Sequence, residues 1–65
     1  MATIADNIKK LRAKKGMTQD DLAREANVKY TTLTKIESDV VKKPSVQTIA
    51  KLAKALSVPM EDLIK

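Results

Sequence analysis

The spacing of apolar residues along the chain is typical of amphipathic helices. They recur three or four positions apart, which places them on one side of each helix. No stretch alternates strictly between apolar and polar residues, so strands are not expected. The pattern predicts an all-α fold, a compact five-helix bundle that forms a single domain over residues 1–65: Ile4 to Lys15, Thr18 to Ala26, Lys29 to Ser38, a helix after Ser45, and Met60 to Ile64.

Residues that favour helix ends stand at these boundaries. Thr3, Thr18 and Ser45 each precede a helical pattern, and their side-chain oxygens suit an N-cap. Gly16 and Asn27 follow the first two helices and tolerate the left-handed turn that ends a helix. The residues expected to face inward are Ile4, Ile8, Leu11, Leu22, Ala23, Ala26, Leu33, Ile36, Val46, Ile49, Leu52, Ala53 and Leu56.

The middle of the chain has the residues that a helix-turn-helix needs. Two short helices that cross steeply require a small residue at the crossing, then a turn residue that accepts positive φ. They also require an apolar plug after the turn and two apolar anchors in the second helix. Ala23, Asn27, Val28, Leu33 and Ile36 meet these requirements in that order, within the segment 18–37.

The outer face of the second of these helices carries side chains suited to a DNA groove. At about 100° per residue, the side opposite the two anchors bears Thr31, Thr34, Lys35 and Ser38. These side chains form hydrogen bonds, and a Thr methyl can touch thymine, as in a major-groove reader. Tyr30 lies at the edge, either exposed to a base or phosphate or covering the end of the core. The alternative for the whole face is an ordinary solvated helix surface.

Arg12 and Glu37 form a predicted ion pair. Arg12 is about 40° around the first helix from Ile8 and therefore lies on its apolar side. Glu37 sits at the flank of the buried side of the third helix. A charge directed at a core needs a partner, so we expect the two to pair and tie these helices together. Alternatively, the long Arg12 side chain extends to solvent.

The charge balance of the chain favours a polyanionic partner. Thirteen Lys and Arg residues against eight Asp and Glu residues give a net charge of +5. Lysine can also serve solubility alone. We expect phosphate contacts from Gln19 beside the Thr18 cap, at a helix N-terminus, and from Lys42 and Lys43 in the loop after the third helix.

The composition argues against several functional classes. The chain has no Cys and no His, so neither a disulfide nor the usual zinc ligands are available, and no metal or other cofactor is expected. No nucleophile has a base beside it and no Gly-rich phosphate loop is present, so we do not expect an enzyme or a small-molecule substrate. We see neither a signal peptide nor a membrane span, and expect a cytoplasmic, nucleoid-associated protein.

Together these motifs resemble the lambda-repressor-like family, also called the Cro or XRE helix-turn-helix family. The resemblance rests on the segments IKKLRAKKGMTQDDLA, NVKYTTLTKIE, PSVQTIAKLAKALSV and MEDLI, which cover almost the whole chain. It implies a five-helix fold and a transcription regulator, most often a repressor. Such a protein binds double-stranded DNA in a sequence-specific way, inserts its third helix in the major groove, and acts as a homodimer on a pseudo-palindromic operator.

The resemblance also assigns roles to residues. Its phosphate-binding Gln matches Gln19, its Arg–Glu pair matches Arg12 and Glu37, and its basic loop residues match Lys42 and Lys43. Its base-contacting positions match Lys29, Tyr30, Thr31, Thr34 and Lys35.

The chain departs from the family pattern in three places. Asn27 stands where Gly is preferred, and Lys29 replaces a Ser or Thr cap. Ser38 and Asp39 stand where Gly commonly follows the Glu, which changes the expected path of that loop.

Two alternatives to a free-standing DNA-binding regulator stay open. One is a protein-interaction module of the same fold, such as an antitoxin subunit or a coactivator-like domain. The other is a DNA-binding domain of a longer regulator. For a DNA-bound dimer we expect reading helices about 34 Å apart. Val58, Met60 and Leu63 either form the two-fold contact or pack within the monomer.

Overall fold

The computed structural model describes residues 3–64, and over this range it contains five helices and no strand. The predicted all-α fold is confirmed. For the four helices whose two ends the sequence predicts, predicted and observed ends differ by one residue at most. The helices are α1 Ile4–Lys14, α2 Gln19–Ala26, α3 Tyr30–Glu37, α4 Val46–Ala55 and α5 Glu61–Ile64.

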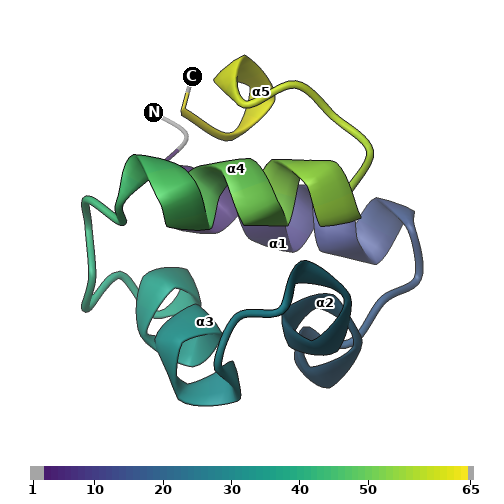
Figure 1. The fold of residues 1–65 in the computed structure, drawn as a ribbon, viewed down its shortest axis with the longest axis horizontal. Coiled ribbons are helices and arrows are strands. Elements are labelled where there is room, and N and C mark those ends of the chain that lie inside the picture. Colours follow the sequence, from purple (N-terminus) through teal and green to yellow (C-terminus); the bar gives the residue numbers. More distant parts are fainter. Residues whose placement is uncertain (1–2, 65) are drawn as a thin grey trace.

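The arrangement of the helices places α3 on the outside of the bundle. In Figure 1, α1 and α4 run across the middle, with α2 and α3 on one side and α5 on the other. α2 packs against α3 and α4, and α1 packs against α3 and α5. Two helices therefore hold α3 from behind, while its opposite face is left uncovered.

The core draws on every helix. Large side chains that are completely or almost completely buried come from all five elements and from the residue that ends α4. Burial of each contributes on the order of 1.5–3 kcal/mol to folding. These side chains are Ile8, Leu22, Leu33, Ile36, Leu52, Leu56 and Leu63.

One prediction about an apolar residue is wrong, and for a second apolar residue the structure decides between two alternatives that the sequence left open. Val46, which was expected to face inward, is 73 % exposed. It is the first residue of α4 and lies about 70° from the centre of the stripe formed by the other four apolar residues of that side. Leu63 is completely buried within the chain and is therefore not available for a two-fold contact, whereas Val58 and Met60 are partly buried against the same core.

The helix ends have the predicted caps. Thr3 and Thr18 each form a capping box with the Asp three residues later, and the Ser45 Oγ accepts from the Thr48 amide at 3.2 Å. Gly16 and Asn27 adopt the left-handed conformation, with φ of 68° and 57°. The ends of α1 and α2, and hence the turn that leads into α3, follow from these local residues.

The capping box of α2 predicts a pH dependence of stability. The backbone N–H of Thr18 donates to the Asp21 carboxylate at 3.1 Å and, with the Thr18 hydroxyl and the charge of Arg24, lowers the Asp21 pKa below its ordinary 3.8. A carboxyl whose pKa is lowered by folding stabilises the protein above its unfolded pKa and loses that effect as the pH falls through the folded value. We expect Asp21→Asn to lower the thermal midpoint at pH 7, with the difference from wild type closing below about pH 4.

The exposed Glu25 of the same helix provides the matched control for this experiment. Melting curves of wild type, Asp21→Asn and Glu25→Gln would be recorded between pH 2 and 7. An Asp21→Asn curve parallel to wild type at every pH would contradict the prediction.

Candidate nucleic-acid interface

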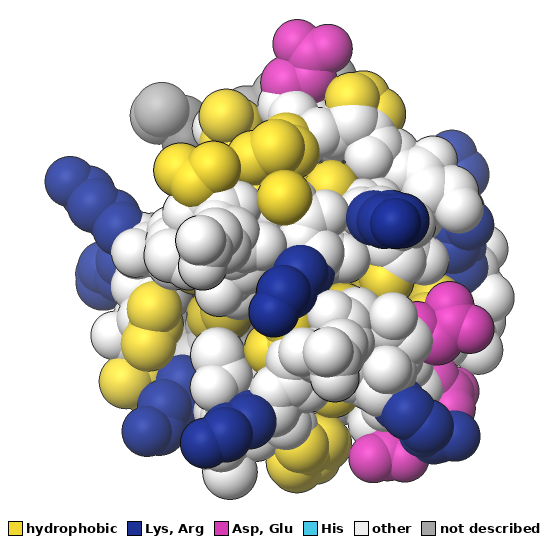
Figure 2. All heavy atoms as spheres, in the orientation of Figure 1, with side chains coloured by type: hydrophobic (Ala, Val, Ile, Leu, Met, Phe, Trp, Pro, Cys, Tyr) yellow, Lys and Arg dark blue, Asp and Glu magenta, His cyan; other side chains and the backbone are white. Residues whose placement is uncertain are grey.

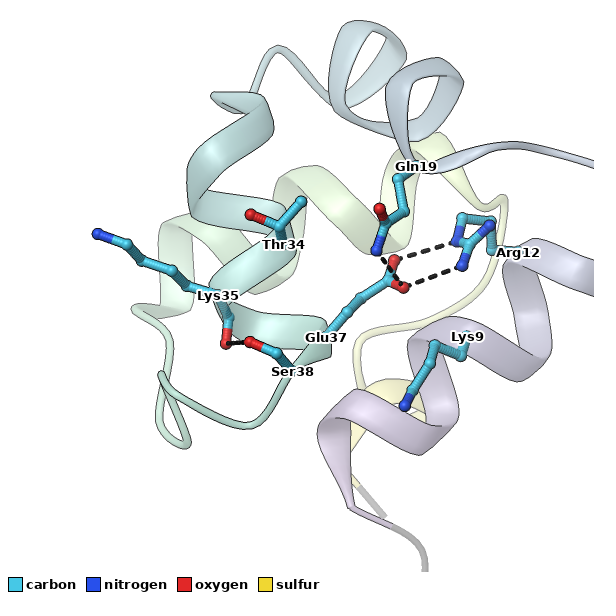
Figure 3. Close-up of a pocket in the computed structure, with 7 residues that line it drawn as sticks. All are labelled: Lys9, Arg12, Gln19, Thr34, Lys35, Glu37 and Ser38. Atoms are coloured by element: carbon cyan, nitrogen blue, oxygen red, sulfur yellow. Dashed lines mark hydrogen bonds and ion pairs between the residues drawn. The ribbon is translucent and has the colours of Figure 1, made fainter.

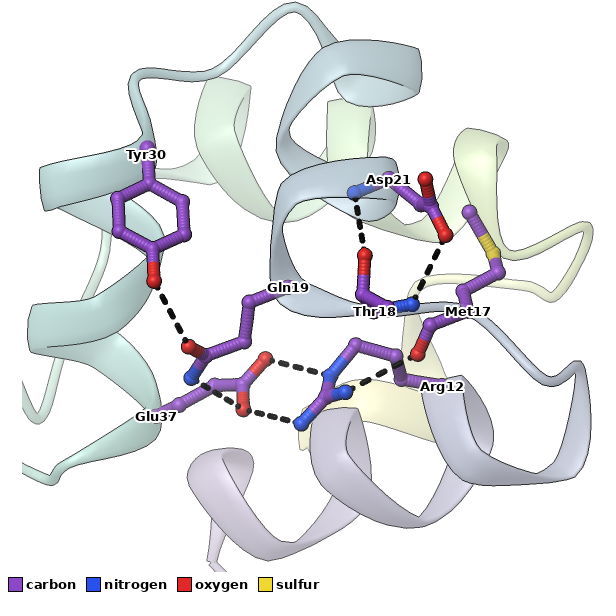
Figure 4. A network of polar contacts seen from close by, with 7 residues as sticks. All are labelled: Arg12, Met17, Thr18, Gln19, Asp21, Tyr30 and Glu37. Carbon is purple, nitrogen blue, oxygen red and sulfur yellow. Dashed lines mark hydrogen bonds and ion pairs between the residues drawn. The ribbon is translucent and has the colours of Figure 1, made fainter.

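A buried ion pair joins α1 to the end of α3. The Arg12 Nε donates to Glu37 Oε2 and its Nη2 donates to Glu37 Oε1, both at 3.0 Å. Glu37 is only 4 % exposed, and the third nitrogen of Arg12, Nη1, donates to the carbonyl oxygen of Met17 at 3.0 Å (Figure 4). This is the pair expected from the sequence. Its two parallel charge-assisted bonds supply the partners that a buried carboxylate needs.

Gln19 extends the ion pair to the outer surface. Its Nε2 donates to Glu37 Oε1 at 3.1 Å, and its Oε1 accepts from the Tyr30 hydroxyl at 3.4 Å (Figure 4). One continuous chain of contacts therefore runs from Arg12 through Glu37 and Gln19 to Tyr30. The sequence expectation for Gln19 was a phosphate contact. In the structure both polar atoms of its side chain contact α3, the nitrogen at Glu37 and the oxygen at Tyr30.

The outward face of α3 exposes most of the predicted base-contacting set. Tyr30 is 50 % exposed, Thr31 and Lys35 are exposed, and Thr34 is partly exposed. The Thr34 hydroxyl donates to the carbonyl of Thr31 at 2.9 Å, and the Ser38 hydroxyl donates to the carbonyl of Lys35 at 3.2 Å. Because these two hydroxyls donate their hydrogen to backbone carbonyls, they can only accept hydrogen bonds from a partner. The Thr34 methyl group adds an apolar contact.

Lys29 stands at the start of α3 without capping it. It occupies the N-cap position with φ −60° and ψ 138°, and its side chain forms no capping hydrogen bond. This agrees with the departure from Ser or Thr noted in the sequence. The Lys29 side chain is exposed beside the first turn of α3, where its charge is available to a partner.

The loop after α3 contains a non-glycine residue with a left-handed backbone conformation. Asp39 has φ 67°, the left-handed conformation that Gly adopts without strain. The Lys35 carbonyl accepts from the amides of Val40 and Val41 at 2.9 and 3.0 Å, which turns the chain back over the end of α3. Lys42 and Lys43 are exposed in this loop, and Lys42 Nζ lies 4.0 Å from the Asp39 carboxylate. Asp39 therefore partly offsets one of the two loop cations.

A shallow hollow lies at the junction of α1, α2 and α3. It has a volume of about 410 Å³ and is drawn in Figure 3. Among the predicted site residues it brings together the ion pair, Gln19, Thr34 and Lys35, but not Thr18, Lys29, Tyr30, Thr31 or the loop lysines. Its lining residues are Lys9, Arg12, Gln19, Thr34, Lys35, Glu37 and Ser38.

Lys9 is the lining residue that sequence reasoning missed. α1 carries several lysines of the same type, and no local pattern distinguishes the one that faces α3. Its position three residues before Arg12 was the available signal, because residues three apart share a side of a helix.

On the face of the molecule drawn in Figure 2, the distribution of charge does not mark an interface. In Figure 2, Lys and Arg side chains are scattered over the α4 side of the molecule rather than gathered in one field. No group of three His, Cys, Asp or Glu side chains within residues 3–64 is arranged to hold a metal ion. Over the same range, no helix combines the length and apolar character needed to cross a membrane.

Comparison with known proteins places this architecture. A search of curated proteins gave no significant match. Among solved structures, the N-terminal DNA-binding domain of SinR from Bacillus subtilis is similar, with a TM-score of 0.89 and 33 % sequence identity over 92 % of this chain and 87 % of that one. The helix-turn-helix family model matches residues 8–63, and this family is not one of enzymes. The chain therefore belongs to the Cro/C1-type helix-turn-helix family.

Proposed function

We propose that this protein is a transcription regulator that binds double-stranded DNA in a sequence-specific way, with α3 in the major groove. The observation that carries the proposal is the division of α3 into two sides. Leu33, Ile36 and Glu37 are buried against the bundle, while the opposite side exposes hydrogen-bonding side chains. The similarity to a domain described as DNA-binding supports it.

The exposed side chains of α3 suit different features of base edges. Lysine donates to the guanine O6 and N7 acceptors of the major groove. The Thr34 oxygen, whose hydrogen is already donated to the Thr31 carbonyl, suits the amino group of adenine, and its methyl suits that of thymine. We therefore propose Lys35 as a reader of guanine and Thr34 as a reader of an A·T pair, with Lys29, Tyr30 and Thr31 beside them.

Contacts to the DNA backbone hold the reader in register in this proposal. The amides at the start of α2 and the side chains of Thr18 and Gln19 take one phosphate region, and Lys42 and Lys43 take another. Such contacts carry no base information, but they fix the orientation of α3. We propose repression as the regulatory outcome, since occupation of a promoter needs no additional activating surface. We also propose a cytoplasmic, nucleoid-associated localisation, because the protein would meet its DNA there.

The proposed assembly on DNA is a homodimer on a pseudo-palindromic operator. Two copies with α3 in successive major grooves would lie about 34 Å apart on one face of the duplex. Because Leu63 is used inside the monomer, Val58 and Met60 are the candidates left from the predicted two-fold contact.

Selection of bound duplexes from a random library tests this function, with Lys35→Ala as the informative variant. We expect wild type to recover a two-fold related consensus, and Lys35→Ala to lose preference for guanine at one position of each half-site, with a discrimination of about 1–3 kcal/mol. A uniform loss across all sequences would reassign Lys35 to a phosphate contact. Absence of binding to any duplex at low salt would favour the protein-interaction module.

A further inference from the structure

We propose that Lys9 is a DNA-backbone ligand, and that the hollow between α1, α2 and α3 receives a phosphate group. This inference rests on the proposed function and extends it, because it adds a contact from α1 to those expected from α2, α3 and the following loop. It is carried by the side chains around the hollow and by the bonds that they already make.

The charges around the hollow leave Lys9 and Lys35 in excess. The lining residues include three cations and one carboxylate, that of Glu37. Arg12 and Glu37 neutralise each other through two bonds of 3.0 Å. Neither lysine takes part in an ion pair in the part of the chain that the structure describes. The hollow therefore carries an excess of positive charge, from Lys9 and Lys35, beside the neutral pair of Arg12 and Glu37.

The two lysines are directed differently. In Figure 3 the ammonium group of Lys35 points outward, away from Glu37, which suits the base-reading role proposed above. Lys9 extends from α1 on the other side of the hollow, below Glu37 and toward the level of Ser38. A phosphate beside the end of α3 would therefore meet Lys9 first.

The other donors near the hollow are largely engaged. All three guanidinium nitrogens of Arg12 donate within the protein, two to Glu37 and one to Met17. Gln19 already donates one amide hydrogen to Glu37. These residues form the floor of the hollow. A cation that contacts a phosphate there therefore has to be the ammonium group of a lysine.

The N-terminus of α2 also needs this additional cation. Helix N-termini attract phosphate through free amides and the helix dipole. Here, however, Asp20 and Asp21 stand in the first turn of α2, and both carboxylates lie on Arg24, at 2.6 and 3.3 Å. The two carboxylates offset the positive end of the dipole, and Arg24 neutralises only one of their two charges, so a phosphate near Gln19 gains from a positive charge supplied by α1.

The experiment compares the salt dependence of DNA binding for Lys9→Gln with that for Lys10→Gln. Lys10 is the neighbouring exposed lysine of α1, but it lines a separate depression with Asp62 and Lys14. Binding to one selected duplex and to one unrelated duplex would be measured from low to moderate salt. Melting curves would verify that both variants fold, as expected for exposed side chains.

We expect Lys9→Gln to lower the slope of log affinity against log salt by about 0.9, the value for one phosphate, and to weaken both duplexes by the same factor. Lys10→Gln should keep the wild-type slope, and Lys9→Arg should restore it. Equal slopes for wild type and Lys9→Gln, or equal losses for both Gln variants, would overturn the inference while the proposed function stands. Failure of wild type to bind either duplex would overturn both.

Discussion

Glu37→Gln should destabilise the protein by about 3 kcal/mol or more, because it leaves the Arg12 guanidinium without its charged partner. Breaking a buried ion pair on one side costs about 3–5 kcal/mol. Arg12 retains 20 % side-chain exposure and can turn partly to water, so the lower end of this range is expected. A domain of 65 residues has roughly 3–10 kcal/mol of total stability, so the loss is a large fraction of it. Urea unfolding at pH 7 measures the change.

Two further variants separate the pair from a general charge effect. Glu25→Gln removes an exposed carboxylate and should change stability by less than about 0.5 kcal/mol. Replacing both Arg12 and Glu37 by Met should be less harmful than Glu37→Gln alone, since no buried charge is then left unpaired. Duplex affinity of Glu37→Gln should also fall, because the end of α3 loses its anchor. A Glu37→Gln protein that unfolds at the wild-type urea concentration would show that the pair contributes nothing.

Leu52→Ala should cost about 2–5 kcal/mol of stability, the range for removing a buried Leu side chain and leaving a cavity. Leu52 is completely buried in α4, within a core cluster that includes residues of all five helices. For a domain of this size the thermal midpoint should fall by roughly 10 °C or more. Thermal unfolding followed by circular dichroism measures the shift.

Val46→Ala is the matched control on the same helix. Val46 is also a branched apolar residue of α4, but it is 73 % exposed, so the substitution should alter stability by less than about 0.5 kcal/mol. If Val46→Ala proved as damaging as Leu52→Ala, the Val46 side chain would be buried in solution, within the chain or against a second molecule.

The sequence predicts the helices of this fold well, because their ends are determined locally. Thr3, Thr18 and Ser45 cap helices through bonds to residues three positions on, and Gly16 and Asn27 adopt the left-handed turns by their own conformational preference. Val46 shows the limit of such reasoning. Its apolar character predicts burial, but whether a neighbouring helix reaches the first turn of α4 depends on the packing of the whole bundle.

The candidate interface could be predicted only in part. The angle between Arg12 and Ile8 is enough to direct a charge toward the core, and Glu37 is a carboxylate at the flank of the buried side of α3. The bridge from Gln19 to Tyr30 depends on how α2 crosses α3, which no local pattern states. Lys9 differs from the other lysines of α1 only by which helix faces it. The DNA contacts themselves stay predictions that the experiments above address.

The two sides of α3 have a consequence for how this protein can change. The residues that hold the helix in place and the residues proposed to meet the bases alternate along it but share no position, since Leu33, Ile36 and Glu37 are buried while Thr31 and Lys35 are exposed. In the proposed complex, substitutions at the exposed positions would therefore change the preference for an operator with little loss of stability. Tyr30 is the exception, because its bond to Gln19 links the two sides. If α3 meets the bases as proposed, the same buried residues would support different binding specificities.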